Sequence, residues 1–190
     1  NGHCGRIHTV KTWHPPNPVA GWEAPQPAPK GLDWDRWVGP NAMVPYSPRR
    51  AHFSFRYFLD FGGGNIRDRG AHIFSIVSWA LGVDATGPVS VECPVGVVPP
   101  GDMYDTPTDM HVIWEFKNPD WNLFWCQPGE KFGEAAFGFK YFGDKGELVV
   151  NGGDGGICES AFKKFAADMA GATARHELTA GSEHFHREAV

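Results

Sequence analysis

The sequence predicts an α+β fold: an open, largely antiparallel β-sheet with helices on one face. Two observations indicate it. Most of the second half of the chain consists of short segments rich in β-branched and aromatic residues, separated by turn residues. Ahead of them, residues 69–81 repeat apolar side chains at three- and four-residue steps, as an amphipathic helix does. Strands in succession beside a helix favour α+β over alternating α/β. The 190 residues suffice for one core, so we expect a single domain over residues 1–190.

The first half of the chain is expected to be mostly irregular. Residues 7–13 alternate between two faces and predict a strand. Prolines recur through residues 14–49 and forbid a long helix or a central strand there. A short helix is predicted at residues 33–37, with Asp33 as its N-cap. The main helix at residues 69–81 should end at Gly82.

Five further strands and two more helical segments are predicted after that helix. The last two strands should form a hairpin around the turn at residues 143–146. The strand ranges are 89–92, 110–116, 123–126, 137–142 and 148–151. The helical segments are 160–170 and 183–190.

Composition excludes several function classes. The net charge is −5, which disfavours a nucleic-acid partner because phosphate contacts need a basic surface. No apolar run approaches the roughly 20 residues that span a bilayer, so no membrane partner is expected. No signal peptide is visible, but the chain does not begin with Met, and both cytoplasm and periplasm remain open for a soluble protein. The 4 cysteines lack Cys-x-x-Cys spacing, which favours free buried thiols.

Three stretches carry a resemblance to a known family. They are residues 31–46, with Gly-Leu-Asp-Trp-Asp-Arg-Trp-Val-Gly-Pro and a later Pro-Tyr, residues 58–82, and residues 141–150. The middle stretch is the most specific: a Gly-Gly-Gly turn is followed by Asp68 and, four residues later, by His72. With these stretches the chain resembles the C-terminal domain of the Gfo/Idh/MocA family, named for glucose–fructose oxidoreductase and inositol dehydrogenase. The resemblance extends over residues 5–187.

The sequence also departs from that family. Its members normally begin with a Rossmann domain whose Gly-x-Gly-x-x-Gly turn cradles a dinucleotide, and no such turn follows a strand here. The family's Glu-Lys-Pro motif is also absent, and Ser75 occupies the Asp position of the His-x-x-Asp pattern. We therefore expect no NAD to bind to this chain alone.

Asp68 and His72 are the expected catalytic residues. Their four-residue spacing places them on one face of a helix, where the carboxylate can orient the imidazole as a general acid or base. The alternative is that Asp68 only caps the helix, where the dipole favours an anion, and that His72 is a satisfied core residue. The family resemblance implies the functional interpretation, because members bind and deprotonate sugar hydroxyls at these positions.

Further side chains are candidates for substrate binding. Arginines near the Gly-rich turn can hydrogen-bond sugar hydroxyls or a carboxylate, or can form surface ion pairs. Aromatic rings near that turn can stack on a sugar, or can simply fill the core. His111 and Glu115 share one face of a predicted strand and face either a substrate or water. The predicted substrate-binding residues are Arg56, Tyr57, Arg67, Trp37, His111 and Glu115.

A metal site is a further expectation. His184 and His186, with His52, Asp68 or His72, would offer mixed nitrogen and oxygen ligands suited to Zn or Mn. The alternative is structural, because the family usually has a similar His-rich stretch leading into a helix.

The sequence is compatible with two hypotheses of function, one enzymatic and one non-catalytic. One is a carbohydrate-active enzyme, a glycoside hydrolase or lyase that acts without NAD on a small sugar or glycoside, with a metal as its electrophile. The other is a non-catalytic domain that keeps the fold for sugar binding or oligomerisation. A part of an NAD(P)-dependent sugar oxidoreductase is a third interpretation. Under the first two we expect a homo-oligomer formed through the open sheet, which would otherwise be an aggregation hazard.

Overall fold

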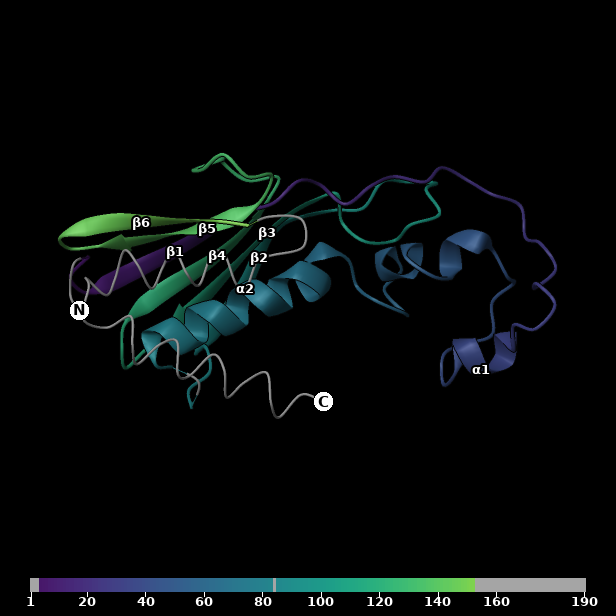
Figure 1. Cartoon of the computed structure of the whole chain (residues 1–190), viewed down its shortest axis with the longest axis horizontal. Helices are drawn as coiled ribbons and strands as arrows, with labels where there is room; N and C mark the ends of the chain where they lie inside the picture. The colour runs from purple at the N-terminus through teal and green to yellow at the C-terminus, as the bar shows by residue number, and fades with distance from the viewer. Residues whose placement is uncertain (1–3, 84, 153–190) are drawn as a thin grey trace.

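A computed structural model describes residues 4–83 and 85–152. Its centre is one six-stranded sheet in the order β2-β3-β4-β1-β5-β6 (Figure 1). The strands are β1 (Ile7–Trp13), β2 (Ser90–Val97), β3 (Asp109–Phe116), β4 (Trp121–Gln127), β5 (Gly138–Gly143) and β6 (Gly146–Asn151). The helical elements are α1 (Trp34–Val38), η1 (Pro48–Arg50), η2 (Ser54–Tyr57) and α2 (Asn65–Leu81). The predicted α+β class is confirmed.

The first strand lies inside the sheet. It pairs parallel to β4 on one side and antiparallel to β5 on the other, and every other neighbouring pair is antiparallel. Val10 stands in register with Leu123 of β4 and Tyr141 of β5. These three side chains belong to the same buried cluster, so they mark the face of the sheet that is covered.

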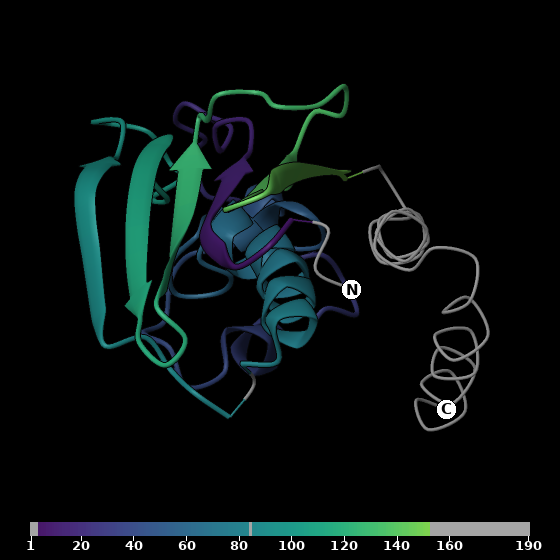
Figure 2. The same ribbon diagram turned by 90° about the vertical axis from the view of Figure 1, so that its left-hand side faces the viewer.

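Helix α2 covers that face. Figures 1 and 2 show it running along one side of the sheet. Ile73 and Val77 are fully buried against the strands. Phe74 makes edge contacts with Trp114 and Trp125, with ring centroids 5.1 and 5.8 Å apart. The helix is therefore held by an aromatic-rich apolar stripe facing the sheet.

The other face of the sheet carries the alternate residues, and we call it the open face. Lys11, Phe124 and Lys140 are neighbours in register across β1, β4 and β5. Side chains alternate along a strand, so they point away from the buried Val10. His111 and Glu115 of β3 pair with β4 residues that lie two positions before or after Phe124 and therefore share its face. Both side chains thus also point to the open face.

The proline-rich segment, residues 14–64, carries α1, η1 and η2 and extends beyond the end of the sheet (Figure 1). The predicted short helix is confirmed as α1, and Oδ1 of its N-cap Asp33 accepts a hydrogen bond from the backbone N–H of Arg36 at 3.0 Å. Among the described residues no helix is long and apolar enough to cross a bilayer.

Two predicted boundaries differ from the structure for physical reasons. Helix α2 begins at Asn65 rather than at residue 69, because Oδ1 of Asn17, far away in the sequence, accepts from the Asn65 N–H at 3.0 Å. Strand β2 continues to Val97 rather than ending at residue 92. It is an edge strand with a register shift between Glu92 and Val95, and such a strand accommodates a proline.

The other predicted strands and the hairpin at residues 143–146 are confirmed, with ends that shift by two residues at most. The helices predicted at 160–170 and 183–190, and the predicted metal ligands His184 and His186, lie outside the described residues.

Candidate functional site

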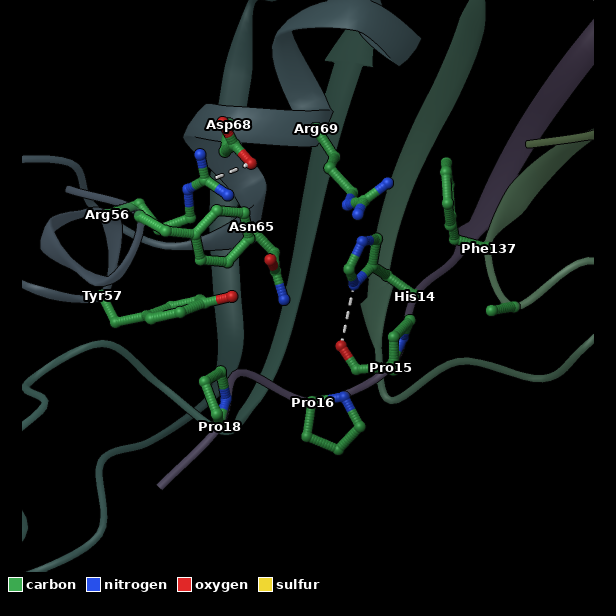
Figure 3. A pocket seen from close by; sticks show the side chains of 12 residues that line it. His14, Pro15, Pro16, Pro18, Arg56, Tyr57, Asn65, Asp68, Arg69 and Phe137 are labelled. Carbon is green, nitrogen blue, oxygen red and sulfur yellow. Dashed lines mark hydrogen bonds and ion pairs between the residues drawn. The ribbon is translucent and has the colours of Figure 1, made fainter. Parts of the chain in front are cut away.

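A small pocket opens where four segments meet: the end of β1, the η2 turn, the first turns of α2 and the loop before β5 (Figure 3). Its volume is about 160 Å³, below the roughly 300–1,000 Å³ of usual ligand pockets. That size favours a ligand no larger than one sugar unit. The residues that line it are His14, Pro15, Pro16, Pro18, Phe53, Arg56, Tyr57, Asn65, Asp68, Arg69, Ala136 and Phe137.

The Gly-rich turn holds two sides of the pocket together. The N–H of Gly64 donates to the carbonyl oxygen of Arg56 at 2.6 Å. A Cβ at Gly62 would collide with the Arg56 backbone, and Gly64 has a φ of +77°, which side-chain-bearing residues rarely adopt. The turn therefore requires glycine, and it places η2 directly beside the first turn of α2.

Asp68 and Arg56 face each other across this junction. Asp68 Oδ2 lies 3.5 Å from Arg56 Nε, an ion-pair separation without hydrogen-bond geometry (Figure 3). The Arg56 guanidinium also lies over the ring of Phe53, 3.8 Å from its centroid. The Asp68 side chain keeps 37% of its surface exposed. The carboxylate is thus oriented by an arginine and still accessible to a ligand.

His14 lies at the floor of the pocket, directly after β1. Its ring stacks on Trp125 with centroids 5.4 Å apart, and it is only 3% exposed. Nδ1 lies 2.8 Å from the carbonyl oxygen of Pro15, which can only accept, so Nδ1 carries the hydrogen. Nε2 is buried and has no hydrogen-bond partner among the described residues. Burial lowers the pKa of His14 to about 4, so Nε2 is an unprotonated acceptor at neutral pH.

The remaining polar groups come from α2 and η2. Arg69 lies over the ring of Phe137, 4.4 Å from its centroid, and Figure 3 shows it beside the imidazole of His14. The side chain of Asn65 points into the space between Tyr57 and His14 (Figure 3). Burial raises the pKa of Tyr57, so its hydroxyl stays protonated and can donate. One carboxylate, two guanidinium groups, an amide, a phenol and an imidazole therefore converge.

The structure brings together three of the residues predicted from the sequence: Asp68, Arg56 and Tyr57 all line the pocket. Asp68 and His72 do share helix α2, as predicted. His72, however, is exposed one turn further along and does not line the pocket. It is neither a core residue nor a neighbour of His14, and its catalytic role stays a prediction.

Other predicted residues lie elsewhere. Arg67 is exposed on α2, and the indole N–H of Trp37 donates to the Arg50 carbonyl oxygen at 3.0 Å. His111 and Glu115 point to the open face, so the sheet separates them from the pocket. There His111 pairs with Asp109 at 3.6 Å, and Glu115 accepts from the Ser90 hydroxyl at 2.9 Å. The predicted role of both residues in substrate binding stays a prediction.

The predicted metal site gains no support from the described residues. Over 4–83 and 85–152, no three His, Cys, Asp or Glu side chains are grouped closely enough to hold an ion. His52 is exposed in a turn with a φ of +50° and lies outside the pocket. Its predicted partners His184 and His186 are not among the described residues, so the metal remains a prediction.

Sequence reasoning missed His14 and Asn65, and it placed Arg69 only among the arginines near the Gly-rich turn. His14 is a single histidine in a proline-rich stretch, and only its place directly after an alternating strand distinguishes it. Asn65 and Arg69 lie on either side of Asp68 in the first turns of α2. An earlier helix start, at the Gly-rich turn, would have placed both near the same opening.

The chain is thus an α+β domain, with an open, mostly antiparallel sheet, one long helix on its inner face and a polar pocket at the start of that helix. The Gfo/Idh/MocA model described as "Oxidoreductase family, C-terminal alpha/beta domain" matches residues 18–100. Residues 18–100 are therefore similar to the C-terminal domain of that oxidoreductase family. The match includes Arg56, Asp68 and Arg69, whereas His14 precedes it and β3 to β6 follow it. No curated protein matches the chain.

Proposed function

We propose that this domain binds a small sugar or glycoside in the pocket at the start of α2 and serves as the substrate-binding part of a carbohydrate-active enzyme. The pocket combines a carboxylate, guanidinium groups, an amide and a phenol with apolar walls formed by prolines and Phe137. Sugars require this mixture, because hydroxyl groups both donate and accept while C–H faces pack on apolar surfaces.

The observation that carries the proposal is the position of Asp68. An exposed aspartate is usually solvated, but this one is held by Arg56 at the mouth of a pocket and stays partly accessible. A carboxylate oriented in this way accepts hydrogen bonds from two neighbouring hydroxyls at once. The family resemblance supports the same use.

Within carbohydrate chemistry, we propose cleavage of a glycoside without NAD as the reaction, with Asp68 and His72 as acid–base residues. Hydrolases generally flank the scissile bond with two carboxylates, and the described lining residues contain one. Elimination needs instead a base that removes the proton from carbon, an acid that protonates the leaving oxygen, and a positive charge near the developing carbanion. The lyase form of the proposal is therefore better supported than the hydrolase form. Sugar binding without catalysis is the alternative.

Binding is tested first. Ligand-observed NMR and calorimetry with glucose, inositol and methyl glycosides should detect binding to the intact chain at pH 7. Asp68→Asn keeps the size of the side chain but removes its charge, so we expect at least tenfold weaker binding. Asp35→Asn, on the exposed surface of α1, is the matched control and should bind as the unchanged protein does. Equal affinity of both variants would remove Asp68 from the site.

Catalysis is tested separately. A panel of aryl glycosides and of glycosides with an activated C–H bond should be turned over without added NAD. Turnover that strictly requires NAD would favour the oxidoreductase interpretation, and loss of turnover with a chelator would support a metal. Binding without any turnover would leave the domain as a non-catalytic sugar-binding module.

A further inference from the structure

We propose that Asn65 selects the ligand by a pair of neighbouring hydroxyls, which its side-chain amide binds as donor and acceptor at once. The ligand class is therefore a ring polyol with hydroxyls on adjacent carbons. The inference deepens the proposed function and rests on it, since it states which part of the sugar the pocket recognises and which residue recognises it.

Asn65 is a buried residue whose side-chain amide has no partner among the described residues. It keeps only 5% of its surface exposed, and its backbone N–H is bound to Oδ1 of Asn17. Figure 3 shows the amide pointing into the space between Tyr57 and His14, where it makes no hydrogen bond to the described part of the chain. A polar group removed from bulk water without a partner destabilises a fold. Folding alone therefore gives no reason for an amide at this position.

Both polar atoms of the amide are accessible from the pocket. The polar atoms that are sealed from solvent and lack a partner include Nε2 of His14 but neither Oδ1 nor Nδ2 of Asn65. A ligand in the pocket can thus reach the amide without any movement of the protein, whereas it cannot reach the His14 nitrogen. Asn65 is therefore the group to which a ligand hydroxyl can bind directly.

The amide determines which ligand groups fit. A side-chain amide carries an NH2 donor and a carbonyl acceptor side by side on one carbon atom. Two hydroxyls on adjacent ring carbons match this pair, because one donates to the carbonyl oxygen while the other accepts from the NH2 group. The match holds for either orientation of the amide. A hydroxyl whose neighbour is missing makes only one of the two hydrogen bonds.

Two neighbouring side chains extend the same recognition. Asp68 follows Asn65 by three residues on α2, so both side chains lie on one side of the helix, and both line the pocket. The Asp68 carboxylate can accept from the next hydroxyl of the ring. The hydroxyl of Tyr57 points toward Asn65 (Figure 3) and can donate, because burial raises its pKa and keeps it protonated. A contiguous series of hydroxyls therefore meets acceptors and donors along the pocket.

A flat heterocycle with a donor and an acceptor on one edge is the alternative ligand for an amide. Such a ring would need an open aromatic face on which to stack. Two phenylalanines line the pocket, and a guanidinium group already covers one face of each. The pairs are Arg56 over Phe53, 3.8 Å from the ring centroid, and Arg69 over Phe137, at 4.4 Å. These contacts favour the polyol over the stacked heterocycle.

Calorimetry at pH 7 measures dissociation constants for D-glucose, D-galactose, D-mannose, myo-inositol and adenine. We expect at least one of the polyols to bind more tightly than adenine. Removal of either hydroxyl of one adjacent pair from the tightest polyol should weaken its binding at least tenfold. Equal binding of all its monodeoxy analogues, or tighter binding of adenine, would overturn the inference and leave sugar binding intact. If none of the polyols binds, the proposed function fails with the inference.

Variants connect the hydroxyl pair to Asn65. Asn65→Ala should weaken binding of the tightest polyol at least tenfold, and the same two deoxygenations should then have little further effect. Its melting temperature should stay at or above that of the unchanged protein, because the amide makes no hydrogen bond within the described domain. If Asn65→Ala fails to fold, Asn65→Asp keeps the size of the side chain and must also bind more weakly, since a carboxylate cannot donate.

The matched control is Gln26→Ala, which removes an exposed side-chain amide outside the pocket and should leave the affinity unchanged. A lowered melting temperature with unchanged affinity in Asn65→Ala would show that Asn65 serves the fold and would refute the inference. Deoxygenation losses that persist in Asn65→Ala would refute it as well, because another residue would then recognise the hydroxyl pair.

Discussion

Acidification should destabilise the fold through His14 by a calculable amount. Its pKa is about 4 in the folded chain and about 6.5 in a solvated one. Between these values the unfolded chain binds a proton that the folded chain excludes. The stability contributed by neutral His14 is therefore fully present above pH 6.5, is lost as the pH falls toward 4, and changes little below that.

The size of the stability loss follows from the difference between the pKa values of His14 in the folded and unfolded chain. Each pKa unit corresponds to about 1.36 kcal/mol, so the free energy of unfolding should fall by about 3 kcal/mol between pH 7 and pH 4 through this one residue. For a domain with a typical stability of about 5–15 kcal/mol, such a loss is easily measured. The physical cause is removal of the ring from water between Trp125 and Phe137.

Urea unfolding at a series of pH values measures the effect. Carboxyl groups add their own pH dependence to every variant, so the informative quantity is the difference between the unchanged protein and His14→Phe. That difference should vary by about 3 kcal/mol between pH 7 and pH 4. His8→Phe, which replaces an exposed histidine on β1, should show no such variation. Parallel pH profiles for His14→Phe and the unchanged protein would show that His14 is not a buried neutral imidazole in the folded chain.

Other perturbations have clear expected outcomes. Gly64→Ala should destabilise the domain by about 1–3 kcal/mol, because its φ is +77° and a Cβ would come within 2.7 Å of Asn17. Thermal denaturation measures the effect, and Gly87→Ala, where a Cβ would meet open space, is the control. Asn17→Ala should lower the unfolding free energy by about 1–2 kcal/mol by removing the cap of α2. Ile73→Ala, fully buried, should lower it by about 2–5 kcal/mol. Sedimentation at micromolar concentration should give a dimer that Phe124→Lys on the open face dissociates; a monomer before substitution would contradict oligomerisation through the sheet.

Much of the fold was predictable because its signals are local. Alternation identified five of the six strands almost to their ends, and a three- and four-residue period identified most of α2. What local patterns do not contain is pairing across long distances. The parallel neighbour of Val10 is Leu123, and the cap of Asn65 comes from Asn17. Neither relation leaves a trace in the intervening sequence.

The candidate site was predictable to the same extent. Arg56, Tyr57 and Asp68 lie on either side of the Gly-rich turn, so sequence proximity placed them together correctly. His111, which the sequence placed facing either a substrate or water, lies on the open face of the sheet. His14 was missed because its significance depends on burial, on the Pro15 carbonyl and on the absence of a partner for Nε2, and each of these exists only in three dimensions.

The position of β1 has a consequence for how the domain is made. The first strand of the chain occupies the inside of the sheet, yet its two neighbours, β4 and β5, begin only at residues 121 and 138. A chain emerging from the ribosome therefore holds an unpaired strand for more than a hundred residues of synthesis. Contacts between such distant segments close slowly, because the loop entropy is lost before the pairing stabilises the structure. Exposed strand edges in this interval can pair with other chains, so efficient production of the protein should depend on slow translation or on chaperones that shield residues 7–13.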